Sequence, residues 1–193
     1  MKTGWTFILV VLTACSSPAS DTSAAPKEAV SKAGATTNAA ETPAPAVSNA
    51  VLTLSPTGLL VGGKLVPFGI PRESAELAIN HVEGRQKDTG SSDECSAGKI
   101  DYTSYKDDLQ LTFQDDKFVG WTINRAASPL RTAKGIGVGS PRQSLDAAYK
   151  YVLVEDSSLG LLFGADGLTG LLDQDGIEGI VTNIWAGTVC LID

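Results

Sequence analysis

Few residues of this sequence have the types and spacing that catalysis requires. His81 is the single histidine, and it lies beside the apolar stripe of a predicted helix, one residue before Val82. Nucleophilic catalysis by a Ser-His-Asp or Cys-His set needs a histidine that is oriented by a third group, and Glu83 falls on another face of that helix. One histidine without a cysteine cluster also offers no zinc ligand set. We therefore predict no catalytic residue, no metal ligand and no cofactor.

Acidic residues offer two further kinds of chemistry. The pairs Asp93-Glu94 and Asp107-Asp108 suit glycoside hydrolysis only if they converge on a cleft. Asp173, Asp175 and Glu178 crowd one turn, as calcium ligands do, but without the spacing of an EF-hand loop. Solvated loops are the simpler interpretation of both sets.

Anion binding has two candidate features. The glycine-rich segment 135–140 precedes a predicted helix, but it lacks the lysine of a P-loop and the glycine spacing of a dinucleotide site, so we interpret it as a tight loop. Arg72 and Arg142 occupy equivalent first-turn positions of two predicted helices, where a positive charge opposes the helix dipole. They are candidate contacts for an anion or for a partner's carboxylate, and the alternative is a solvated surface role.

An internal repeat predicts the elements that carry these residues. Residues 69–82 and 139–152 align at a spacing of 70, with six identities in fourteen positions. Each segment carries apolar residues at helical spacing and a proline at the first helical position. Ser140 and Gln143 add a capping-box pattern to the second helix.

Strand patterns follow both predicted helices. The expected strands are Lys99–Ser104, Leu109–Phe113, Phe118–Ile123, Leu159–Phe163, Gly170–Leu172, Ile177–Trp185 and Thr188–Ile192. Asp115-Asp116-Lys117, Asp166-Gly167 and Asp175-Gly176 are typical of hairpin turns. We therefore predict an α+β fold of two tandem units, about 58–126 and 129–193, each a helix packed on an antiparallel sheet, with one shared core.

The chain opens with an export pattern. Lys2 is followed by an apolar run, residues 5–12, that is too short to span a membrane. The next residues, Leu12-Thr13-Ala14-Cys15, resemble the lipobox of bacterial lipoprotein signals. That resemblance implies removal of residues 1–14 and acylation of Cys15. Ser16 in place of Asp after the cysteine implies outer-membrane sorting, facing the periplasm or the cell surface; the alternative is an ordinary secretory signal with a chance cysteine.

Composition separates a tether from a folded domain. Residues 15–50 are dominated by Ala, Ser, Thr and Pro and lack aromatic residues, which is typical of a disordered tether. Large apolar residues become frequent near Val51, so residues 51–193 are the predicted domain. That domain holds 12 basic and 19 acidic side chains. Such an acidic balance disfavours nucleic acid and anionic lipid heads as partners.

The cysteine count agrees with this organisation. The three cysteines are Cys15, Cys95 and Cys190. If Cys15 carries lipid, one pair remains, and an oxidising compartment allows Cys95 and Cys190 to form a disulfide. The alternative is two buried free thiols.

The tandem arrangement is similar to that of small exported bacterial proteins, namely the β-lactamase-inhibitor-protein-like and outer-membrane-assembly lipoprotein folds. The shared signal is the helix start at Gly69 and Gly139, followed by hairpins. It carries no interface motif, so it bears on architecture alone. We expect a non-enzymatic, lipid-anchored module that binds a protein or envelope component. The alternatives are a hydrolase with acidic catalytic residues and a carrier of a small ligand or metal ion.

Overall fold

The structure, a computed structural model, describes residues 51–124, 128–150 and 152–190. The chain divides into two units, Met1–Ala44 and Pro45–Asp193, and every described residue belongs to the second. The predicted signal peptide, Cys15 and the whole of the predicted tether lie outside the described residues.

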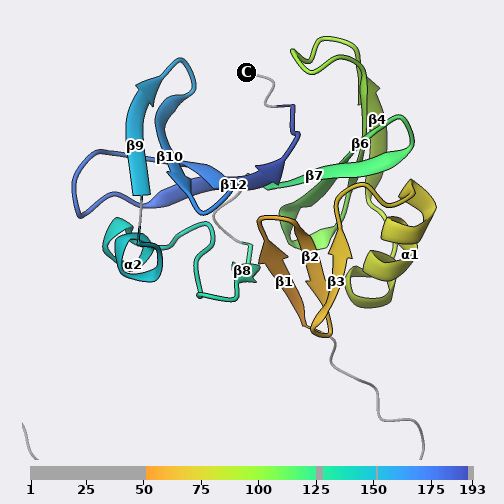
Figure 1. The fold of residues 1–193 in the computed structure, drawn as a ribbon, viewed down its shortest axis with the longest axis horizontal. Coiled ribbons are helices and arrows are strands. Elements are labelled where there is room, and N and C mark those ends of the chain that lie inside the picture. The colour runs from red at the N-terminus through yellow and green to blue at the C-terminus, as the bar shows by residue number, and fades with distance from the viewer. Residues whose placement is uncertain (1–50, 125–127, 151, 191–193) are drawn as a thin grey trace, which may run out of the picture. The chain divides into compact units, whose positions relative to one another are not determined.

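An eight-stranded antiparallel sheet forms the larger layer (Figure 1). Each half is a meander in which consecutive strands are neighbours, and the halves join where β7 pairs with β12, with Trp121 opposite Ala186. The first half comprises β4 (Asp88–Ser92), β5 (Ile100–Ser104), β6 (Leu109–Gln114) and β7 (Lys117–Ile123). The second comprises β9 (Val152–Ser157), β10 (Gly160–Ala165), β11 (Leu168–Leu172) and β12 (Val181–Gly187).

Two of the predicted turns are confirmed. Asp115 and Asp116 have φ of 50° and 58° between β6 and β7, and Asp166 and Gly167 have φ of 49° and 82° between β10 and β11. A two-residue hairpin turn matches the twist of the paired strands when both of its residues have positive φ. Asp and Gly reach this region at low cost, so local sequence fixes these two hairpins.

A four-stranded sheet forms the second layer. Its strands are β1 (Leu52–Ser55), β2 (Gly58–Val61), β3 (Lys64–Pro67) and β8 (Arg131–Thr132), in the order β3-β2-β1-β8. The helices are α1 (Arg72–Glu83) and α2 (Arg142–Ala148), with a 3-10 turn η1 (Lys106–Asp108). Neither α-helix among the described residues has the length and apolar character to cross a bilayer.

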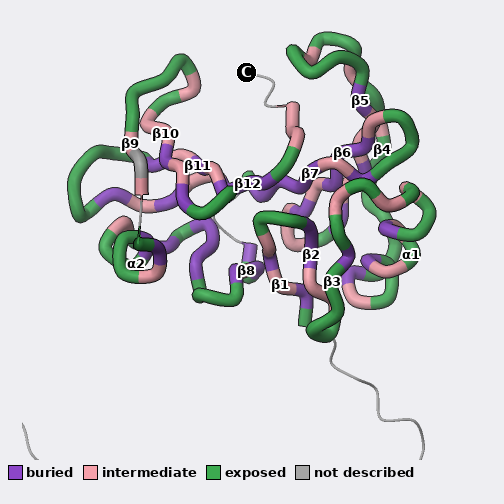
Figure 2. The backbone as a smooth tube through the Cα atoms, in the orientation of Figure 1, coloured by how far each residue is buried: buried purple, intermediate pink, exposed green. Residues whose placement is uncertain are grey.

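The core lies between the two sheets. Leu109, Leu111 and Trp121 from the large sheet are fully buried, and they belong to one apolar cluster with Leu54 and Leu59 from the small sheet. Figure 2 shows buried residues concentrated along β6, β7 and β12, the middle of the large sheet. Since side chains alternate along a strand, the residues between these core positions point to the opposite face of the large sheet.

The predicted α+β fold of two helix-on-sheet units is wrong. The described chain is mostly β, and its helices of 12 and 7 residues are too short to cover eight strands. Strands β1–β3, together with β8, supply the second layer over the core. These strands were not predicted from the sequence, because each is only two to four residues long and carries no clear periodic pattern.

The two helix starts nevertheless make the same backbone contacts. Gly69 and Gly139 have φ of 90° and 86°, which only glycine adopts easily. The amide of Gly69 donates to the carbonyl of Phe118 at 2.7 Å, and that of Gly139 donates to the carbonyl of Val181 at 2.7 Å. The repeated glycines therefore bind one helix start to β7 and the other to β12. These two strands join the halves of the large sheet, and we call their junction the seam.

The second helix differs from its predicted form. No side chain caps it, because the Ser140 hydroxyl instead accepts a hydrogen bond from the Gly137 amide at 3.0 Å. The capping-box prediction is therefore wrong. The helix ends at Ala148, and Val152, which the repeat placed on its apolar stripe, begins β9.

Candidate functional site

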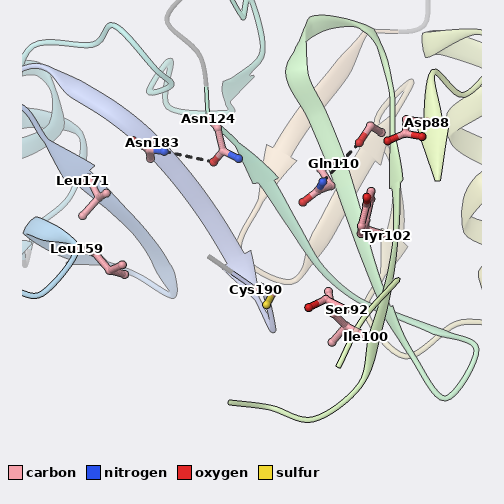
Figure 3. A pocket seen from close by; sticks show the side chains of 11 residues that line it. Asp88, Ser92, Ile100, Tyr102, Gln110, Asn124, Leu159, Leu171, Asn183 and Cys190 are labelled. Carbon is pink, nitrogen blue, oxygen red and sulfur yellow. Dashed lines mark hydrogen bonds between the residues drawn. The ribbon is translucent and has the colours of Figure 1, made fainter. Parts of the chain in front are cut away.

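A cavity of about 550 Å³ opens on the face of the large sheet that points away from the core. We call it the trough. Its volume falls within the range of about 300–1,000 Å³ that is usual for small-ligand sites. Both halves of the sheet contribute to its lining, which consists of Asp88, Ser92, Ile100, Tyr102, Ser104, Gln110, Asn124, Leu159, Leu171, Asn183 and Cys190 (Figure 3).

Strand alternation places these side chains. Leu109 and Leu111 point into the core, so Gln110 between them points into the trough. Its neighbour across the strand pair is Ser104, and the Gln110 amide donates to the Ser104 hydroxyl at 3.4 Å. Ser104 in turn pairs with Asp88, so one row of polar side chains crosses three strands.

Tyr102 forms the aromatic part of one wall. It stands opposite Gly90 in the pairing of β4 with β5, and a Cβ atom at Gly90 would overlap the phenol end of its ring. The missing side chain at Gly90 thus allows the ring to lie across the edge strand. Glycine beside an aromatic residue on a neighbouring strand also stabilises the sheet edge.

Amide groups lie where the two halves meet. The Asn183 side chain on β12 donates to Asn124, which directly follows β7, at 3.3 Å (Figure 3). Leu171, opposite Asn183 in the strand pairing, and Leu159 form an apolar wall on the side of β10 and β11. The trough therefore has a polar wall with one aromatic ring, an amide pair at the seam and an aliphatic wall.

The cysteine pair closes one side of the trough. Cys95 and Cys190 lie at disulfide distance, with Cα atoms 5.5 Å apart, which confirms the predicted pairing. The segment before Cys190 crosses β7, and the Thr188 amide donates to the Val119 carbonyl at 2.8 Å. A Cβ atom at Gly120 would overlap the Thr188 carbonyl, so glycine is required for this crossing.

The part of the trough lining that the structure describes carries one formally charged side chain. Asp88 is its single ionisable carboxylate, and no Lys, Arg or His is among the eleven lining residues. Recognition of a phosphate or carboxylate by charge pairing needs Arg or Lys. The described lining therefore suits a neutral ligand that forms hydrogen bonds.

The two candidate arginines lie on the helices, outside the trough. The Arg72 guanidinium contacts Glu76 at 2.9 Å and the Thr103 hydroxyl at 3.0 Å, and it lies 4.7 Å from the centre of the Phe113 ring. Arg142 contacts Asp146, one helical turn away, at 2.7 Å. These contacts bind α1 to β5 and β6 and stabilise α2 internally, and the two arginines do not meet.

The other candidate groups are also apart from the trough. His81 is exposed and borders a smaller apolar hollow between β3 and α1. Asp173 accepts from the Ile180 amide and Asp175 from the Gly176 amide, both at 2.7 Å, so these carboxylates stabilise their own turn. Asp108 lies outside the lining, but its carboxylate accepts a hydrogen bond at 3.0 Å from the backbone amide of Asn124, a lining residue.

Two buried titratable groups, Glu83 and Tyr105, were not predicted from the sequence. Burial raises the pKa of the Glu83 carboxyl, with Lys106 lowering and Asp107 raising it to a smaller extent. Burial also raises the pKa of the Tyr105 hydroxyl to about 12, which the neighbouring Gln86 amide partly offsets. Glu83 exposes 7% of its surface and Tyr105 1%, and neither lines the trough. Glu83 ends α1 and Tyr105 lies in the loop after β5, so neither position belongs to a periodic apolar pattern that would predict its burial.

Comparison of the chain with protein-family models, with curated proteins and with solved structures yields no match.

Proposed function

We propose that this protein is a lipid-anchored module of the bacterial cell envelope that binds an envelope component through the trough. The observation that carries the proposal is the convergence of side chains from both halves of the large sheet on one concave, nearly uncharged site. The lipobox-like sequence ending at Cys15 supports the anchor, and Ser16 supports outer-membrane sorting. A tether of about 35 residues would let the domain reach partners away from the membrane.

A hydrolase with acidic catalytic residues is supported less well. Glycoside hydrolysis requires two carboxyl groups on either side of the scissile bond. In the lining that the structure describes, Asp88 is the only carboxylate, and Asp93 and Glu94 lie outside it. A carrier of metal ions has as little support, since residues 51–124, 128–150 and 152–190 contain no group of three potential ligands.

A crosslinking pull-down from intact cells tests the proposal. The full-length protein is the bait, Cys15→Ser is the unanchored control, and Asn183→Arg fills the trough with a long charged side chain. Gln143→Arg, on the exposed surface of α2, is the matched control for the added charge. We expect one dominant envelope component that is lost with Cys15→Ser and with Asn183→Arg but is retained with Gln143→Arg. Equal capture by all four proteins would contradict the proposal.

A further inference from the structure

We infer that the ligand of the trough is a neutral saccharide that stacks on Tyr102 and is held by the amide side chains beside it. This inference rests on the proposed function, because it names the chemistry of the component that the trough would bind.

The backbone of the trough leaves recognition to side chains. Asp88 and Ser92 lie on the edge strand β4, but the other lining residues within strands lie on β5, β6, β11 and β12, which are paired on both sides, so their main-chain groups are committed to the sheet. A peptide that binds by adding a strand needs a free sheet edge. The trough therefore favours a ligand that is recognised by scattered hydroxyl and amide contacts over an extended peptide.

The polar groups match the hydroxyl groups of a sugar. A carboxamide offers an acceptor oxygen and two donor hydrogens, and a hydroxyl of the ligand both donates and accepts. The bond from Asn183 to Asn124 is long, at 3.3 Å, and it uses one donor of Asn183 and the oxygen of Asn124. Among the described residues, the side-chain oxygen of Asn183 and the side-chain amide hydrogens of Asn124 have no other hydrogen-bond partner, so they can serve a ligand. Asp88, in the same lining, can accept hydrogen bonds from two adjacent hydroxyls.

The apolar surfaces match the faces of a pyranose ring. Tyr102 presents an amphipathic ring whose phenol end is held across Gly90. Leu159 and Leu171 supply an aliphatic surface on the other wall. A pyranose ring has C–H groups on its faces and hydroxyls at its rim, so successive rings of an oligosaccharide can contact the aromatic and the aliphatic wall in turn while their rims reach the amides. The lining residues that the structure describes include no Lys, Arg or His, which favours a neutral sugar over an anionic one.

Isothermal titration of the disulfide-bonded domain, residues 51–193, with chitotetraose, maltotetraose and cellotetraose tests the inference. The same titration of the full-length protein in detergent shows whether removal of residues 1–50 has itself abolished saccharide binding. We expect at least one neutral tetrasaccharide to bind. Tyr102→Leu should weaken that binding by roughly 3- to 10-fold, since it removes the aromatic ring, whereas Tyr102→Phe should remain within about threefold. Asn183→Ala should weaken it by roughly 3- to 10-fold, and Gln143→Ala should leave it unchanged.

Circular dichroism and thermal unfolding of each variant separate loss of binding from loss of the fold. Co-sedimentation with peptide-free glycan strands whose muramic carboxyl groups have been reduced distinguishes the two sources of such a neutral sugar: strands that pellet the protein indicate an envelope polymer, and binding to tetrasaccharides alone indicates a free oligosaccharide. No binding by the wild-type protein to any tetrasaccharide or strand at millimolar concentrations would overturn the inference. Binding that Tyr102→Leu leaves intact would also overturn it, by placing the sugar elsewhere. If the pull-down still yields a trough-dependent protein, the proposed function stands and only its saccharide ligand is rejected.

Discussion

The indole nitrogen of Trp121 donates a hydrogen bond of 2.8 Å to the backbone carbonyl of Ser55. Trp121 lies in the middle of the large sheet and is fully buried, and Ser55 ends the first strand of the small sheet. This bond links the two layers at the seam where β7 meets β12. Because the trough lies on the other face of that seam, the packing beneath Trp121 supports the floor of the binding site.

Trp121→Phe tests the contribution of this link. The change removes one hydrogen bond, leaves the Ser55 carbonyl without its donor and opens space in the core. We expect the free energy of unfolding to fall by about 2–3 kcal/mol, measured by urea denaturation. A loss below about 0.5 kcal/mol, the size of an ordinary surface effect, would show that the bond does not hold the layers together.

Gly120→Ala tests the crossing of the chain over β7. The added methyl group overlaps the Thr188 carbonyl, so the segment before Cys190 must shift, and we expect a loss of about 1–3 kcal/mol in stability. Gly164→Ala is the matched control, because a Cβ atom there meets no atom within 4 Å. It should be neutral or stabilise by up to about 1 kcal/mol. Equal effects of the two substitutions on the unfolding midpoint would contradict this description of the crossing.

Glu83 predicts a pH dependence of stability. Burial raises the pKa of its carboxyl above the ordinary value of 4.5, so the folded chain holds this proton more tightly than the unfolded chain. Its contribution is therefore most favourable below pH 4.5 and is lost as the pH rises through the folded pKa. Glu83→Gln should be more stable than wild type above that pKa, and the difference should shrink as the pH falls towards 4.5.

Thermal unfolding across pH 4–8 measures the effect of Glu83. Glu73→Gln removes an exposed carboxyl from the first turn of the same helix and is the control for the loss of one acidic side chain. Parallel curves for wild type and Glu83→Gln would show that the buried carboxyl does not titrate differently in the folded chain.

Reduction of the disulfide should destabilise the domain. Cys95 and Cys190 are 95 residues apart, and a loop of that length corresponds to roughly 4–5 kcal/mol in the chain-entropy model. We expect the Cys95→Ser, Cys190→Ser double variant to unfold at a clearly lower denaturant concentration than wild type without reductant. With reductant the two proteins should behave alike, and an unchanged midpoint in both conditions would contradict a stabilising bridge.

Local chemistry made part of this structure predictable. The hairpin turns at Asp115 and Asp166 follow from residues that tolerate positive φ, and the cysteine pairing follows from the count once Cys15 is set aside. The helix starts were visible because Gly69 and Gly139 stand in equivalent sequences. The turns and helix starts depend on a few neighbouring residues, and the disulfide depends on the number of cysteines, so each can be read without knowing which distant segments pair.

The second layer and the trough depend on contacts between distant segments. β8 has only two residues and pairs with β1, which is distant in sequence, so no periodic pattern predicts it. β4 lies in a polar segment without a strand pattern, and it forms because pairing with β5 fixes it at the sheet edge. Asp88, Tyr102 and Asn183 become neighbours of one cavity only after the whole sheet has formed. Sequence alone therefore gave no reason to single them out.

The most direct test of the account is site-specific photo-crosslinking in intact cells. A photoreactive residue is placed at Gln110 or Asn183 in the trough and, as a control, at Gln143 on α2, each in the full-length chain and in its Cys15→Ser form. We expect the two trough positions to crosslink to the same envelope component, Gln143 to give no such product, and the product to be lost without Cys15. Crosslinking at Gln143 with none at Gln110 or Asn183 would contradict the claim that the trough is the binding face.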